Sequence, residues 1–193
     1  RARLFVLVDD HSRLLVAGRW TGNETLRAGQ ELLHAAILRR GLPESLYVDN
    51  GAAYAGAELA RSCAILGIRL IHSRPYAPEG RGKQERLNRV IRERFLLEAT
   101  TVGIASLDEL NDRFAAWVER YLNVRVHTET GESPLARYAR GSHRDANPEL
   151  LRAAFLWSAH RRVSRTATVS FEGNEYEVDS ALAGRTVELR YRP

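Results

Sequence analysis

The sequence predicts an α/β protein with a mixed sheet flanked by helices, followed by part of a small β-barrel module. Short apolar runs and helix-type repeats alternate in the order β-β-α-β-α-β up to residue 71, which is typical of a layered α/β domain. Beyond residue 161 the helix-type repeats give way to short strands separated by turns. The end of the chain is therefore expected to be a module of its own.

Each predicted element has a local signal in the sequence. The expected strands are apolar runs at 4–8, 14–18, 46–48 and 68–71. The expected helices repeat apolar side chains at helical spacing over 23–40, 57–66, 83–97 and 106–121. The first two strands should form a hairpin around the polar turn Asp9–Arg13, with at least one strand buried on both faces. Asn23 is the expected N-cap of the first helix, and Ser106 with Glu109 forms a capping box on the last.

Two stretches should interrupt the regular elements. Residues 75–82 hold two prolines and two glycines, which predicts a loop that leads into the next helix. Residues 141–148 are expected to form a linker. The predicted domains are 1–140 for the α/β core, 141–160 for a linker and helix, and 161–193 for a partial β-barrel. The tail strands are expected at 165–171, 175–178 and 186–191.

The positive charge of the chain is concentrated in one segment. The net charge is +5, and residues 69–94 alone carry eight Arg or Lys against three Glu. Such a stretch suits a polyanion such as nucleic acid. Two alternatives stay open. The stretch can be a solvated helix face, and the arginines can reflect codon usage, because Lys83 is the one lysine among 29 basic residues.

The remaining composition points to an intracellular protein. The single cysteine, Cys63, lies among apolar side chains and is expected in the core. No signal peptide and no apolar run approaching the roughly 18 residues of a membrane span are present, so we expect no membrane partner. The chain begins without methionine and contains none, and we expect it to be a fragment.

Two carboxylates suggest a metal site. Asp49 follows the apolar run at 46–48, Glu85 opens the helix at 83, and 35 residues separate them. Sites in α/β folds gather where strands end, so the two side chains can converge. Carboxylates select Mg²⁺ or Mn²⁺, and a two-metal site with ions about 3.5–4 Å apart catalyses phosphoryl transfer. Taken singly, Asp49 fits a common Asp-Asn-Gly turn, and Glu85 fits an exposed carboxylate paired with Arg89.

Together these segments resemble the DDE superfamily of transposases and integrases. Residues 47–51 and 76–86 resemble the segments that hold its second Asp and final Glu, including the spacing between them. Residues 8–13 resemble the second strand and turn of that core. Residues 121–134 resemble the segment that follows it in bacterial insertion-sequence transposases. The tail from Arg162 is similar to the small β domain behind the core of phage-Mu-type transposases.

The resemblance implies an RNase H-like fold and a bacterial, cytoplasmic enzyme that cuts DNA 3′ ends and transfers the strand. Asp49 and Glu85 would ligate two Mg²⁺ or Mn²⁺ ions with a first Asp on a strand before Leu4. No residue of this chain corresponds to that Asp, so we expect residues 1–193 alone to be inactive. Asp9 and Asp10 are expected to be turn residues that pair with Arg13 or cap backbone N–H groups.

The resemblance also implies DNA contacts and partners. The predicted DNA-binding residues are Arg74, Arg81, Lys83, Asn88, Arg92, Arg125 and His127. The expected partners are transposon-end and target DNA and further copies of the chain, as a dimer or a higher assembly; an accessory ATPase is left open. Two other functions also stay open: a catalytically silent DNA-binding or assembly module of the same fold, and an RNase H-like nuclease that only hydrolyses.

Overall fold

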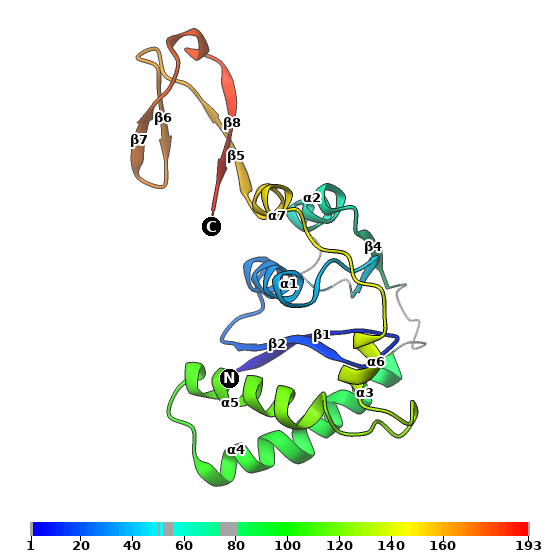
Figure 1. Ribbon diagram of the computed structural model, residues 1–193. Helices are drawn as coiled ribbons and strands as arrows, with labels where there is room; N and C mark the ends of the chain where they lie inside the picture. Colours follow the sequence, from blue (N-terminus) through cyan, green and yellow to red (C-terminus); the bar gives the residue numbers. More distant parts are fainter. Residues whose placement is uncertain (1, 50, 52–55, 74–80, 193) are drawn as a thin grey trace.

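A computed structural model of the protein describes residues 2–49, 51, 56–73 and 81–192 (Figure 1). The strands of the α/β part are β1 (Arg3–Val8), β2 (Leu15–Thr21), β3 (Ser45–Val48) and β4 (Arg69–His72). Its helices are α1 (Leu26–Arg40), α2 (Ala57–Leu66), α3 (Arg81–Val90), α4 (Leu97–Val102), α5 (Leu107–Trp117) and α6 (Pro134–Ala139). A π-helical segment, η1 (Ile91–Leu96), joins α3 to α4, and a second, η2 (Val118–Leu122), extends α5.

The predicted hairpin is confirmed. Strands β1 and β2 pair antiparallel, with Leu4 opposite Trp20. In the turn, Asp9 Oδ2 accepts hydrogen bonds from the backbone N–H of Ser12 at 2.7 Å and from its hydroxyl at 2.6 Å. Arg13 completes the turn with a positive φ of 66°. The turn is therefore held by a side-chain carboxylate, as expected for Asp9.

The hairpin is buried on both faces. Phe5 and Leu7 pack toward α1, while Leu4 and Val6 pack toward the aromatic cluster of the opposite helical layer. Figure 1 shows this arrangement, with α1 on one side of β1 and β2 and the helices α4 and α5 on the other. The alternation of inward residues along β1 is what a strand covered on both faces requires.

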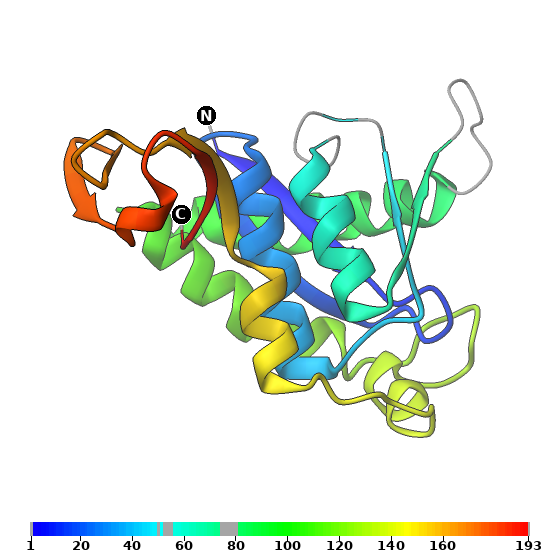
Figure 2. The same cartoon turned by 90° about the horizontal axis from the view of Figure 1, so that it is seen from above.

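The other strand pair is parallel. Val48 of β3 lies opposite His72 of β4, so both strands end at the same edge. Figure 2 shows the two strands side by side, with α2 next to them. Their core includes Cys63, which is 1% exposed, and burial raises the pKa of its thiol to about 11. Cys63 is a core residue, as predicted.

The strands form an antiparallel pair and a parallel pair, and no described strand joins the two. The outer edge of β2 is closed by amide side chains. Asn111 pairs with the backbone of Trp20, accepting at 2.7 Å and donating at 3.0 Å. Asn123 pairs with the backbone of Leu15 in the same way, at 3.0 and 3.1 Å. These amides satisfy strand-edge groups that would otherwise be left without partners beside the α5–η2 helix.

The tail forms the predicted small β module. Helix α7 (Pro148–Ala154) leads into β5 (Trp157–Arg162), and β6 (Thr168–Phe171), β7 (Asn174–Glu177) and β8 (Thr186–Tyr191) follow, with a short 3₁₀ turn, η3 (Ser180–Leu182). Strand β5 pairs with β8, and β6 pairs with β7. Figure 1 shows these strands projecting away from the α/β part. The division into 1–140, 141–160 and 161–193 stays a prediction.

Three sequence expectations need correction. The N-cap of α1 is Thr25, not Asn23, because the Thr25 hydroxyl accepts from Ala28 N at 3.2 Å. The helix expected over 83–97 extends from 81 to 102 through η1. Strand β5 was not expected, because four of its six residues are polar and it is defined by pairing with the distant β8.

We predict that Asn123→Ala lowers the free energy of unfolding by about 2–4 kcal/mol, because the N–H and C=O of Leu15 lose buried partners that cost roughly 1–3 kcal/mol each. Asn123 is fully buried. Urea denaturation followed by circular dichroism measures the change. Asn88→Ala, at an exposed position of α3, is the matched control. An equal effect of the two substitutions would contradict the role of Asn123.

Candidate metal and nucleic-acid site

Asp49 lies directly after β3 at the edge where β3 and β4 both end. Its side chain is exposed, and Oδ1 accepts a hydrogen bond from Gly51 N at 2.9 Å. The Asp49 side chain therefore makes the local hydrogen bond to the backbone that the expected Asp-Asn-Gly turn predicts. This bond uses one carboxylate oxygen, and no cation pairs with Asp49 among the described residues.

Glu85 lies in the first half of α3 and is exposed. The ion pair with Arg89 that a purely structural role predicts does not occur in the described part of the chain. A carboxylate without a cation partner is a suitable ligand for a divalent metal ion. The donor chemistry of Asp49 and Glu85 therefore fits Mg²⁺ or Mn²⁺. Within the described residues, no group of three or more His, Cys, Asp or Glu side chains could hold a metal ion.

Two predicted DNA-binding residues lie wholly or partly outside the described part of the chain. Arg74 lies outside the described residues, and Arg81 begins α3 with a side chain that is also outside the description. Asn88 and Arg92 are described and exposed. They follow Glu85 by three and seven residues, so all three lie on one side of the helix. The structure thus groups Glu85, Asn88 and Arg92 on one helix face.

Lys83 and Arg86 are three residues apart and share another face of α3, and each pairs with a carboxylate from another segment. Lys83 Nζ lies 2.6 Å from Asp10 Oδ1, in the hairpin turn. Arg86 pairs with Glu129, in the loop after η2. The hydrogen bond from Lys83 is the main reason that the pKa of Asp10 lies below its ordinary value.

Arg13 connects the two pairs. Its guanidinium Nη1 lies 3.5 Å from Asp10 Oδ1, and its Nε lies 3.8 Å from Glu129 Oε2. The expected pairing of Asp10 with Arg13 is confirmed. The roles of Arg86 and Glu129 were missed, because nothing in the sequence indicates which distant charges meet. We call Asp10, Arg13, Lys83, Arg86 and Glu129 the charge network.

Arg125 and His127 belong to the loop beside the charge network. Arg125 Nη1 donates to the Tyr121 hydroxyl at 3.0 Å, and its guanidinium lies 5.4 Å from the centre of that ring. His127 Nδ1 accepts from Glu129 N at 3.3 Å. Burial is the main cause that lowers the pKa of His127, and nearby arginines, including Arg13, add to it. His127 is thus a partly buried, hydrogen-bonded residue of the loop.

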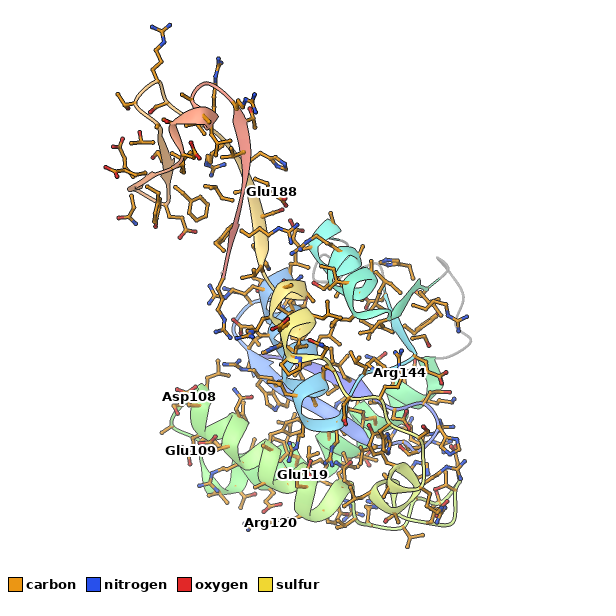
Figure 3. The ribbon with its side chains drawn as sticks, turned by 45° about the horizontal axis from the view of Figure 1, so that its top comes forward. Asp108, Glu109, Glu119, Arg120, Arg144 and Glu188 are labelled. Carbon is orange, nitrogen blue, oxygen red and sulfur yellow. The ribbon has the colours of Figure 1, made fainter. Side chains whose placement is uncertain are left out.

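The α5–η2 helix fixes this loop relative to α1. Glu119 Oε2 accepts from Arg40 Nη2 at 3.0 Å, and Arg39 approaches Glu119 at 3.2 Å. Figure 3 shows Glu119 well along the helix, with Asp108 and Glu109 at its opposite end. The predicted cap at that end is confirmed, since Ser106 Oγ accepts from Glu109 N at 3.0 Å. The helix therefore positions Arg125 at one end and leaves its other end far from the charge network.

Protein-family models match the chain in three places. Models described as "Integrase core domain" match residues 1–78 and 66–134, and one described as "Mu transposase, C-terminal domain" matches residues 148–193. The chain belongs to the DDE transposase and integrase superfamily. The two core matches cover the α/β part, and the third covers α7 and the β module. The resemblance stated from the sequence is therefore confirmed along the chain.

Individual relatives agree with this family. The transposase for transposon Tn552 of Staphylococcus aureus is 24% identical over 216 residues, which cover 100% of this chain and 45% of that protein. An intasome structure of simian T-cell lymphotropic virus, in complex with PP2A regulatory subunit B56 gamma, is 26% identical. It has a TM-score of 0.60 and covers 76% of this chain and 52% of that chain. The chain thus spans less than half of the curated transposase.

A third likeness concerns the fold alone. The catalytic core domain of HTLV-2 integrase, in complex with magnesium in a trimeric form, is 21% identical with a TM-score of 0.58. The match covers 71% of this chain and 84% of that domain. The RNase H-like fold class is confirmed. No helix in the described part of the chain is long and apolar enough to cross a membrane.

We predict that the protein loses stability as the pH falls below about 6.5, and that His127→Gln makes this loss smaller. The folded state lowers the pKa of His127 from the ordinary value of 6.5. Between the lowered pKa and 6.5 the unfolded chain therefore binds more protons, so stability is present above this window and is lost as the pH falls through it. His34 contributes in the same direction, mainly through burial.

Urea denaturation at a series of pH values measures the effect. His160→Gln, at an exposed position of β5, is the control. An unchanged pH profile in His127→Gln would contradict the prediction, even if the substitution lowered stability by the same amount at every pH.

Proposed function

We propose that this chain is the core of a bacterial DDE transposase that cuts DNA at transposon 3′ ends and joins them to target DNA. The proposal rests on the chemistry and exposure of Asp49 and Glu85. Both match the superfamily motif, both are exposed, and neither has a cation partner in the described structure. The family membership of the chain and its basic α3 segment support the same function.

Asp49 and Glu85 would hold a pair of Mg²⁺ or Mn²⁺ ions. When bound, such ions activate an attacking water or 3′ hydroxyl and stabilise the charge that develops at phosphorus. The protein supplies the carboxylates and the positioning of DNA beside them. The family resemblance implies that the third carboxylate of the set is an Asp on a strand that precedes Leu4.

The helix face of α3 and η1 that carries Glu85 would bind the DNA backbone. Asn88 and Arg92 are exposed on it, so an amide and a guanidinium can donate hydrogen bonds to phosphates. Lys83, from another face of α3, and Arg125, from the loop after η2, would add contacts to the DNA backbone, and His127 would shape the loop that carries Arg125. Arg74 and Arg81, which precede this face in the sequence, are proposed to contact the same DNA.

The assembly and location of the protein are part of the same proposal. Joining two transposon ends requires at least two active sites on one DNA complex, so we propose a dimer or a higher assembly that acts in the bacterial cytoplasm. An accessory ATPase is included as a partner only because of the family resemblance. Its addition to the strand-transfer reaction, with and without ATP, tests this part.

A catalytically silent DNA-binding or assembly module is the second candidate. An RNase H-like nuclease, the third candidate, would share the metal ligands but would give hydrolysis without joined products.

We predict that Asp49→Asn and Glu85→Gln each abolish strand transfer by the intact gene product, because each removes a charged metal ligand. The assay uses DNA that carries the element's own ends, with Mg²⁺ or Mn²⁺, and detects joined products on a gel. Asp108→Asn is the matched control, since Asp108 is exposed at the far end of α5 (Figure 3). Residues 1–193 alone are expected not to cleave.

The possible products separate the three candidates. Binding of end DNA without cleavage by the intact wild type would support the silent module. Cleavage without joining would support a nuclease. Full activity of either carboxylate variant, or metal-dependent nicking by residues 1–193 alone, would contradict the proposed ligand set.

We predict that Lys83→Ala and Arg92→Ala weaken binding of end DNA and reduce the salt dependence of the affinity. Each lost phosphate contact lowers the slope of log K against log salt by about 0.9. Fluorescence anisotropy with labelled duplex DNA over a range of salt concentrations measures both quantities. Arg113→Ala, which removes a cation paired with Glu109 on α5, is the control. Unchanged affinity and slope in both variants would exclude this surface.

A further inference from the structure

The charge network contains two carboxylates that each face two cations. Asp10 lies within ion-pair distance of Lys83 and Arg13, at 2.6 and 3.5 Å. Glu129 pairs with Arg86 and lies 3.8 Å from Arg13. The carboxylates come from the hairpin turn and from the loop after η2, while Lys83 and Arg86 come from α3. Two acidic groups of the protein thus occupy cations of the segment proposed to bind DNA.

These pairs are exposed, so they can exchange partners. The side chains of Lys83 and Arg86 are 48% and 58% exposed, and that of Asp10 is 82% exposed. Ion pairs at such positions are weak and are screened by salt. A DNA backbone carries closely spaced phosphates, and it can therefore replace a single carboxylate beside each cation.

Arg13 differs from the other two cations. Its side chain is only 20% exposed, and its buried Nε has no hydrogen-bond partner in the described structure. Arg13 therefore stays with the hairpin turn when DNA approaches, and it remains beside Asp10 and Glu129. The network then has a fixed cation and two cations that are free to exchange.

We propose that Asp10 and Glu129 compete with the DNA backbone for Lys83 and Arg86, and thereby limit how tightly the protein binds DNA of any sequence. This inference rests on the proposed DNA-binding function of α3. It assigns to two acidic residues, and to Arg86, a role in setting affinity. When binding to DNA of any sequence is weaker, the contacts that only the transposon ends can make supply a larger share of the total binding energy.

The test uses the intact gene product and a labelled duplex of mixed sequence. We expect Asp10→Asn and Glu129→Gln each to tighten binding about two- to fivefold, the change that loss of a competing exposed ion pair allows. The salt dependence should become steeper, by up to about 0.9 in slope for each cation that gains a phosphate. Circular dichroism confirms that the variants are folded.

Glu31→Gln is a closely matched control for the change in net charge. Glu31 also faces two cations, Arg27 at 2.9 Å and Arg19 at 3.4 Å, but on α1 and β2. Its side chain is 45% exposed, against 44% for Glu129. An increase in affinity caused by net charge alone would occur equally in Glu31→Gln.

A double-mutant cycle connects the effect to its cation. In a Lys83→Ala background, Asp10→Asn should lose most of its effect, because the cation for which Asp10 competes is gone. The inference is overturned if Asp10→Asn and Glu129→Gln tighten binding no more than Glu31→Gln does. It is also overturned if Asp10→Asn keeps its full effect in the Lys83→Ala background. If Lys83→Ala and Arg92→Ala both leave the affinity of the wild type unchanged, the proposed DNA surface fails as well. If either substitution weakens binding, only the competition is rejected.

Discussion

The arrangement of the site depends on how the β1–β2 hairpin satisfies its backbone while both of its faces are covered by helices. A buried strand edge leaves N–H and C=O groups that need partners. Asn123, which is fully buried, supplies both partners to Leu15, and Asn111 supplies them to Trp20. These two amides attach the α5–η2 helix to β2 at two points. The helix cannot slide along the strand without breaking four hydrogen bonds.

This attachment determines where the loop after η2 begins. Asn123 directly follows η2 and is fixed to the hairpin, so Arg125 and Glu129 start from a fixed point. Glu129 then meets Arg86 on α3, and Asp10 in the hairpin turn meets Lys83. The hairpin is therefore connected to α3 in two ways. Its own turn contacts α3 directly through Asp10, and the loop that Asn123 attaches to it contacts α3 through Glu129. The helix that carries Glu85 is positioned by both.

Local signals in the sequence predicted the elements well. Helix α2 runs from Ala57 to Leu66 as expected, because the following Gly67 adopts a φ of 65° that ends the helix. The candidate ligands Asp49 and Glu85 were also identified from their neighbours in the sequence. The contacts of the site were not. Asn123 and Leu15 are 108 residues apart, and Lys83 and Asp10 are 73 apart. No local pattern indicates which distant polar groups will meet, and β5 was missed for the same reason.

The two halves of the long helix from 81 to 102 are held by different forces. Ile91 and Phe95, at and beyond its midpoint, are 2% and 4% exposed and pack into the aromatic cluster with Phe114. The half that carries Glu85 adds the partly buried Leu87 to this cluster and is otherwise held by exposed ion pairs, which contribute little and respond to salt. Glu85, the proposed metal ligand, thus lies on the less firmly packed half of its helix. If DNA replaces Asp10 and Glu129 beside Lys83 and Arg86, it takes over the contacts that position this half. Phosphate binding and the placement of Glu85 would then be coupled through one helix, and the carboxylate would be fixed most firmly when DNA is present.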